Sequence, residues 1–256
     1  MTREKNFAFS SNISDENLLT PTFIVPTLVL LPGMDGTGSL FVEFVATLPS
    51  ALQPQIVSYP PDQPLGYAEL TALVSQQLPR NEPFLLLGES FSGPVALALA
   101  AQRPSGLRGL VLVSSFAKRP ARVPGWLRPM VTRLPVTKVP TRLAAALLLG
   151  RNYTPIWQAR LKAAMSAVSA ATWQARLKAI LDVDLSDRLP QIKVPVLYLQ
   201  ATHDRVVSPW ALEHICRYLP KMQIVRIAGP HFLLQARPLE SAAAIYEFAR
   251  KWGLVS

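Results

Sequence analysis

Leu85–Pro94 reads LLLGESFSGP, and this stretch decides the fold. An apolar run typical of a buried strand leads into a turn of small residues and then into a helix that begins near Gly93. This arrangement predicts a nucleophile elbow, in which Ser90 occupies a strained turn with its hydroxyl exposed above the end of the strand. The usual pattern is G-x-S-x-G, and here Ser92 takes the last position, where a small side chain still fits. The alternative is that Ser90 only caps the following helix.

A serine hydroxyl becomes a nucleophile when a base takes its proton, and that base is oriented by a carboxylate. The sequence contains three histidines that could be the base: His203, His214 and His231. His214 falls within a helical pattern, which favours a packing or surface role. His203 and His231 each follow a predicted strand, and the order of residues along the chain decides between them.

After a nucleophile elbow of this kind, the acid comes next along the chain and the histidine comes last. Ser90, Asp204 and His231 satisfy this order, and each lies just beyond a predicted strand. Because such strands end at one edge of a parallel sheet, we expect the three side chains to converge there as a catalytic triad. The alternative is that Asp204 and His231 only form turns. Three rival acids lie at the end of an insert rather than after a strand: Asp182, Asp184 and Asp187.

The loop at residues 32–38, after the first predicted strand, reads PGMDGTG. Backbone N–H groups stabilise the oxyanion that forms on an attacked carbonyl, and the predicted donors are Met34 in this loop and Phe91 beside the nucleophile. A glycine-rich loop can also cradle phosphate, but this one lacks the lysine of a P-loop and does not fit G-x-G-x-x-G. The scattered histidines and Cys216 have no metal-ligand spacing, so we expect no metal and no cofactor.

Short apolar runs alternate with helical-period segments through most of the 256 residues, which predicts βα units around a mostly parallel sheet. The expected strands are Thr27–Leu31, Gln55–Ser58, Phe84–Gly88, Gly109–Ser114, Val194–Gln200 and Gln223–Ile227. The expected helices lie near Leu40–Leu48, Tyr67–Gln77, Gly93–Gln102, Pro209–Leu219 and Leu239–Trp252.

The alternation breaks once, in a segment rich in Ala, Leu, Arg and Lys that prolines punctuate. We expect residues 117–190 to form a helical lid on a core made of residues 1–116 and 191–256. Within the insert, WQARLKA occurs at Trp157–Ala163 and again at Trp173–Ala179, which favours two related helical turns over a repeat array. Large apolar residues of the insert either line an acyl pocket or pack the lid onto the sheet. The predicted substrate contacts are Trp126, Leu147 and Trp157.

The net charge of +10 is concentrated in this insert, since residues 117–192 hold 13 of the 26 Lys and Arg but only 3 of the 16 Asp and Glu. A charge excess of this kind is either a solvated surface or a surface that attracts an anionic partner. Candidate partners are an acidic carrier protein, an anionic lipid surface or a negatively charged small-molecule ester. No nucleic acid is expected, because basic and aromatic residues do not form a binding motif for it.

The first residues lack the apolar core of a signal peptide, and no apolar run approaches the roughly 20 residues of a membrane span. The single Cys216 cannot form an internal disulfide, so nothing points to an oxidising compartment. We therefore expect a cytoplasmic protein with no transmembrane segment.

Four segments occur in the order LLPGMDGTG, LLLGESFSGP, LQATHDRVVSP and IAGPHFLLQARP. Together they resemble the α/β-hydrolase superfamily over nearly the whole chain. Within that superfamily, the size and arrangement of this chain are similar to those of small carboxylesterases such as the pimeloyl-carrier-protein methyl ester carboxylesterase. The resemblance implies an α/β-hydrolase fold with a mostly parallel sheet, flanking helices and an inserted helical lid. It also implies a serine carboxylesterase that hydrolyses short- to medium-chain acyl esters through an acyl-enzyme. The alternatives are an acyltransferase or thioesterase with the same triad, and a catalytically silent binding protein.

Overall fold

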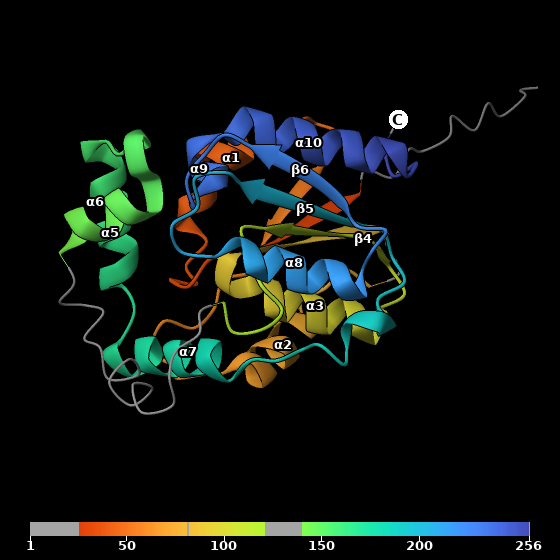
Figure 1. Ribbon diagram of the computed structural model, residues 1–256, viewed down its shortest axis with the longest axis horizontal. Coiled ribbons are helices and arrows are strands. Elements are labelled where there is room, and N and C mark those ends of the chain that lie inside the picture. The colour runs from red at the N-terminus through yellow and green to blue at the C-terminus, as the bar shows by residue number, and fades with distance from the viewer. Residues whose placement is uncertain (1–25, 81, 121–139, 256) are drawn as a thin grey trace, which may run out of the picture.

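The computed structural model describes residues 26–80, 82–120 and 140–255. Within these residues, six strands form one parallel sheet in the order β2-β1-β3-β4-β5-β6 (Figure 1). The strands are β1 (Thr27–Leu31), β2 (Gln53–Ile56), β3 (Phe84–Glu89), β4 (Leu107–Val113), β5 (Val196–Ala201) and β6 (Gln223–Ile227). The α/β architecture with a parallel sheet flanked by helices, expected from the sequence, is confirmed.

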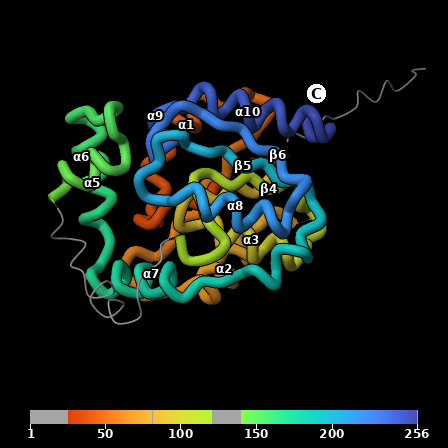
Figure 2. Tube along the Cα trace, in the orientation of Figure 1, coloured from red at the N-terminus to blue at the C-terminus, as the bar shows by residue number. Residues whose placement is uncertain are grey.

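Helices cover both faces of the sheet (Figures 1 and 2). Three of them, α2 (Tyr67–Ser75), α3 (Gly93–Gln102) and α8 (Pro209–Tyr218), lie on one face, while α1 (Val42–Ala46) and α10 (Pro238–Lys251) lie on the other. Successive residues of β3 therefore enter two different cores: Phe84 and Leu86 pack on the first side, and Leu85 and Leu87 on the second. Burial on both faces explains why this strand is a continuous apolar run rather than an alternating one.

The predicted boundaries of β1, β6 and α3 agree with the structure, whereas β2 begins two residues earlier than predicted. β2 is an edge strand that pairs only with β1 in the sheet order, and its residues Gln53–Ile56 are half-buried or exposed. Polar residues and Pro54 are tolerated at such an edge, so hydropathy does not mark where the strand starts. The short helix α9 (Leu233–Ala236) was not predicted.

The described part of the insert between β4 and β5 contains α5 (Thr141–Leu149), α6 (Pro155–Ser166) and α7 (Ala170–Asp182). Figure 1 shows α5 and α6 beyond the carboxyl ends of the strands. The two WQARLKA copies lie on α6 and α7, which begin at capping hydroxyls: Thr154 Oγ1 accepts from the N–H of Trp157 and Ser169 Oγ from that of Thr172. The division at residues 117 and 190 stays a prediction.

Within the ranges given above, none of the helices combines the length and the apolar character that crossing a membrane requires.

A close contact fixes α3 against the chain that leaves β4. A Cβ built on Gly93 would lie 1.7 Å from Ser115 Oγ, and one built on Gly88 would lie 2.8 Å from the Cβ of Ala96. Such distances are shorter than any real contact, so both positions require glycine for close packing rather than for an unusual φ.

We expect Gly93→Ala to lower the free energy of unfolding by about 1–3 kcal/mol, because the added methyl overpacks the junction of α3 with Ser115. Urea unfolding followed by circular dichroism measures the effect. Gly33→Ala is the matched control, since its Cβ would meet its nearest atoms at an ordinary 3.7 Å. Equal stabilities of the two variants would contradict the close-packing argument.

Candidate active site

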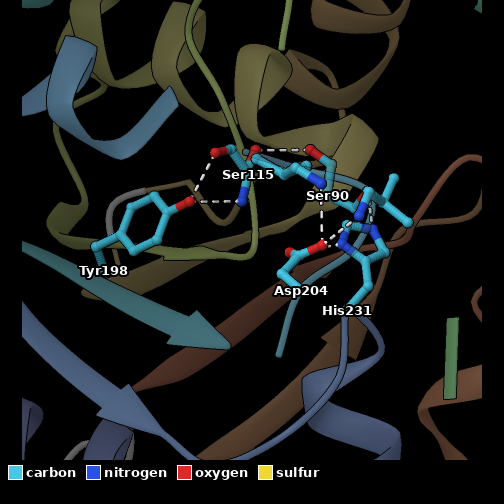
Figure 3. Close-up of polar contacts among 7 residues, drawn as sticks. Ser90, Ser115, Tyr198, Asp204 and His231 are labelled. Carbon is cyan, nitrogen blue, oxygen red and sulfur yellow. Dashed lines mark hydrogen bonds and ion pairs between the residues drawn. The ribbon is translucent and has the colours of Figure 1, made fainter. Parts of the chain in front are cut away.

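Ser90 follows β3 at a tight turn that leads directly into α3. Its φ of 48° is in the left-handed region, which is strained for a residue with a side chain. Ser115 Oγ donates to the carbonyl oxygen of Ser90 at 2.6 Å, and Tyr198 hydroxyl donates to the carbonyl of Ser115 at 2.7 Å (Figure 3). Ser115, which follows β4, thus holds the strained main chain and is itself held by Tyr198 of β5. The sequence carried no spacing pattern that identified Ser115 or Tyr198.

Ser92, which replaces the usual glycine of the elbow, is fully buried and has its own hydrogen bonds. Its hydroxyl donates to the carbonyl oxygen of Pro32, so the Tyr59 hydroxyl 2.6 Å away must be the donor in their mutual bond. Burial raises the pKa of Tyr59 well above its usual value, which keeps that hydroxyl protonated. Ser92 thus ties the elbow, residues 88–93, to the loop at residues 32–38.

The structure brings Ser90, Asp204 and His231 together (Figure 3). Ser90 Oγ lies 2.8 Å from His231 Nε2, and His231 Nδ1 lies 2.8 Å from Asp204 Oδ2. The other carboxylate oxygen, Oδ1, accepts from the N–H groups of Val206 and Val207 at 2.8 and 2.9 Å. An ionised carboxylate only accepts, so Nδ1 carries the imidazole hydrogen and Nε2 accepts from the Ser90 hydroxyl. This is the geometry of a serine with an adjacent oriented base.

The loops that carry Asp204 and His231 extend the pairing of β5 with β6. The N–H of Thr202 donates to the carbonyl oxygen of Ile227 at 3.0 Å, and the N–H of His203 donates to that of Gly229 at the same distance. These bonds bring Asp204 and His231 to one edge of the sheet.

The other two histidines lie elsewhere. The His203 side chain is exposed, whereas His214 is buried on α8, next to the rings of Trp210 and Tyr218 and 2.9 Å from Ser186 Oγ. Of the rival acids, Asp184 forms an ion pair with Lys118 at 2.6 Å where the insert leaves the core. Asp182 ends α7, and Asp187 lies in the turn that follows. Among the three histidines, therefore, His231 alone meets Ser90.

A cavity of about 260 Å³ lies beside Ser90 and is mostly apolar. Its lining includes Ser90, His231, Phe91 and Met34, so both predicted oxyanion donors border it. The insert supplies much of the remaining wall: Ala144, Leu148, Leu161, Met165, Trp173 and Ile180.

The predicted substrate contacts in the insert are placed differently. Leu147 is 43% exposed, and Trp157 packs with Leu161 and Leu40 in a cluster between the insert and the core; neither lines this cavity. Trp126 lies outside the described residues. Because Leu147, Leu148 and Leu149 are all apolar, hydropathy alone did not reveal which of them faces the cavity.

A larger, open groove of about 1010 Å³ runs between α2, α3 and α7. It contains none of Ser90, Asp204 and His231, so size alone does not locate the site. No three His, Cys, Asp or Glu side chains gather as metal ligands in the part of the chain that the structure describes.

Glu89, the residue before Ser90, is a buried acid that contacts two neighbouring segments. Its Oε1 accepts from Gln235 Nε2 on α9 at 3.0 Å, and its carboxyl also hydrogen-bonds to the backbone of Gly33. Burial raises the pKa of Glu89 to about 8, and the negative charge of Asp35 adds to the increase. Glu89 is therefore largely protonated at pH 7.

Residues 28–244 match the alpha/beta hydrolase family, so the chain belongs to this family. It is 26% identical over 225 residues to polyketide synthase ThaQ of Burkholderia thailandensis, covering 80% of this chain and 11% of that protein. It is 35% identical over 109 residues to the chloroplastic phytyl ester synthase 1 of Arabidopsis thaliana, covering 39% of this chain and 16% of that protein. The chain thus spans less than a fifth of the length of either relative.

Solved structures of low sequence identity share the fold. The enol-lactonase from Burkholderia xenovorans LB400 superposes with a TM-score of 0.74 at 19% identity, over 88% of this chain and 92% of that one. An esterase from Exiguobacterium antarcticum has the same TM-score at 16% identity and the same coverage of both chains. At such low sequence identity, these similarities show that the fold is shared and nothing more.

The buried carboxyl of Glu89 makes the stability of the fold depend on pH. Between its ordinary pKa of 4.5 and about 8, the unfolded chain releases this proton while the folded protein keeps it. The contribution of Glu89 to the free energy of unfolding should therefore fall by roughly 3–5 kcal/mol as pH rises through this window, and should level off above it. Glu89→Gln, which cannot ionise, should remove this contribution.

Urea unfolding of the wild type and of Glu89→Gln at several pH values across that window measures the difference. The stability of the variant relative to the wild type should increase steadily with pH. Parallel curves for the two proteins would show that Glu89 does not titrate as its burial requires.

Proposed function

We propose that this protein is a serine carboxylesterase that hydrolyses short- to medium-chain acyl esters. The observation that carries the proposal is the hydrogen-bonded chain from Ser90 through His231 to Asp204, with 2.8 Å at each step. The apolar cavity that begins at Ser90 provides a place for an acyl group. Membership of the alpha/beta hydrolase family agrees with this chemistry.

In the proposed reaction, Ser90 Oγ attacks the ester carbonyl while His231 Nε2 takes the hydroxyl proton. Asp204 holds the imidazole in the required tautomer and stabilises its positive charge, and the N–H groups of Met34 and Phe91 receive the oxyanion. Collapse of this intermediate transfers the proton from His231 to the departing alcohol. Water then attacks the acyl-enzyme and loses its proton to His231. Collapse of the second intermediate returns this proton from His231 to Ser90 Oγ and releases the carboxylic acid.

The cavity suits a modest acyl chain. At about 30 Å³ for a group of the size of a water molecule, 260 Å³ has room for roughly eight or nine such groups. Leu148, Leu161 and Met165 would surround the chain with apolar contacts, and each buried methylene contributes about 0.8 kcal/mol of transfer free energy. The volume of the cavity supports short to medium acyl chains, and its apolar lining supports binding of the chain.

Hydrolysis of a thioester substrate through the same acyl-enzyme is one alternative, and a second candidate function is acyl transfer to an alcohol. The similarity to a protein named as an ester synthase favours it, although it extends over 39% of this chain. Product analysis with an added alcohol separates the candidates: a new ester indicates transfer, and free acid alone indicates hydrolysis.

We also propose that the basic insert attracts a negatively charged partner or substrate. If it attracts an acidic carrier protein or a negatively charged substrate, kcat/KM for such a substrate should fall as salt rises to about 0.5 M, because added ions screen exposed charges. A neutral ester of the same acyl chain is the control. A kcat/KM that does not change with salt for the charged substrate would contradict the attraction.

We expect Ser90→Ala to lower ester turnover by about 10⁴-fold or more, because the nucleophile is removed. Hydrolysis of p-nitrophenyl esters and labelling with a fluorophosphonate probe measure the loss, and circular dichroism checks the fold. Ser75→Ala, at an exposed position on α2, is the control that should retain both activities.

Ester turnover that persists in Ser90→Ala would refute the nucleophile. A wild-type protein that neither labels nor hydrolyses any ester would instead favour a catalytically silent binding protein.

A further inference from the structure

Each copy of WQARLKA carries an arginine at its fourth position, and the two arginines have different surroundings. Arg160 on α6 is 35% exposed, lies over the ring of Trp157 and forms an ion pair with Glu43 of α1 at 2.5 Å. Arg176 on α7 is only 1% exposed, and its guanidinium is buried against the loop at residues 32–38. The equivalent positions of the repeat therefore form a matched pair, one at the surface and one buried.

The Arg176 guanidinium holds the loop that carries Met34. Its Nη1 donates to the carbonyl oxygens of Met34 and Asp35, each at 2.8 Å, and its Nη2 donates to that of Pro60 at 3.1 Å. The loop is shaped to receive it: Gly36 has a φ of 70°, and a Cβ there would lie 2.8 Å from Nη1. A side chain at position 36 would therefore collide with the guanidinium.

The same loop is also held by the elbow. Ser92 Oγ donates to the carbonyl of Pro32, and the Glu89 carboxyl hydrogen-bonds to the backbone of Gly33. Met34 follows these two anchored residues, and its own carbonyl is bound by Arg176. Because peptide planes are rigid and each residue has only two soft dihedrals, anchors on both sides leave the N–H of Met34 little freedom.

Burial of this guanidinium is costly. Desolvation lowers the pKa of Arg176, although the nearby negative charge of Asp35 opposes the change. Its Nε has no hydrogen-bond partner among the residues that the structure describes. A buried charge that is incompletely paired is often less stabilising than an apolar side chain of similar size. Stability of the fold alone is therefore a poor explanation for an arginine at this position.

The face of α7 that presents Arg176 also forms part of the cavity wall. Trp173 and Ile180 line the cavity beside Ser90, and they are three residues before and four residues after Arg176. Residues at this spacing share one helix face. A single face of the insert thus borders the cavity and holds the loop that carries Met34.

We propose that Arg176 is a positioning residue that holds the N–H of Met34 where the oxyanion forms. The inference rests on the proposed function, because an oxyanion forms only if Ser90 attacks a carbonyl. The planar guanidinium holds two loop carbonyls and a third from Pro60 at once, whereas the ammonium of lysine is a point charge on a flexible stem. Arg176→Lys therefore keeps the charge and releases the loop.

The test compares Arg176→Lys with Arg160→Lys, its match in the other copy of the repeat. The kcat and KM for a short p-nitrophenyl ester are measured per active site, counted by fluorophosphonate titration so that unfolded molecules do not contribute. We expect kcat of Arg176→Lys to fall by about 10- to 100-fold with KM changed less than about threefold, since a displaced oxyanion donor acts on the transition state. Arg160→Lys should stay within about twofold of the wild type in both constants.

A second readout separates positioning from general damage. A trifluoromethyl ketone inhibitor forms a tetrahedral anion on Ser90, so its affinity should fall by the same factor as kcat in Arg176→Lys, while that of an unreactive amide analogue stays unchanged. If Arg176→Lys gives no titratable protein, Arg176→Gln replaces it with the same expected results.

Unchanged kcat and inhibitor affinity in an active Arg176 variant would overturn the positioning role alone. A wild-type protein that neither hydrolyses esters nor labels would overturn the proposed function, and this inference with it.

Discussion

The left-handed turn at Ser90, with a φ of 48°, is the constraint on which the other features of the site depend. A conformation of this kind costs on the order of 1–3 kcal/mol and persists only where its surroundings allow no alternative. All residues of β3 and residues 93–101 of α3, which flank the turn, are buried, and Gly93 contacts Ser115 too closely for any side chain. Ser115 also binds the carbonyl of Ser90. The large core therefore supports a strained turn that a small one could not.

The parallel sheet explains how Ser90 can share a hydrogen bond with His231, 141 residues away. Neighbouring parallel strands end at the same edge, so the residues that follow β3, β5 and β6 converge without long loops. This arrangement also explains why order along the chain was sufficient to select His231 over His203. His203 follows a strand as well, but its backbone pairs with Gly229 while its side chain faces solvent.

The core strands and the meeting of Ser90, Asp204 and His231 were predictable from the sequence, because buried strands and tight turns leave local patterns. The supporting contacts were not. Arg176 reads as one more basic residue of a charged insert, and nothing in its neighbours indicates that it reaches the carbonyl of Met34, 142 positions earlier. The prediction of the cavity wall was wrong for a related reason. Leu147 and Leu148 are equally apolar neighbours on α5, and which of them faces the cavity depends on how tertiary packing rotates the helix.

The contacts around the loop at residues 32–38 connect the insert between β4 and β5 to the active-site side of the sheet. Glu89 and Ser92 hold one part of the loop from the elbow, but the carbonyls of Met34 and Asp35 are bound by Arg176 from α7. Without docked α7 those two carbonyls would lose these bonds, and the guanidinium would return to water. The cost of burying Arg176 is thus offset by hydrogen bonds to the loop and to Pro60, which are available only with α7 packed against the loop.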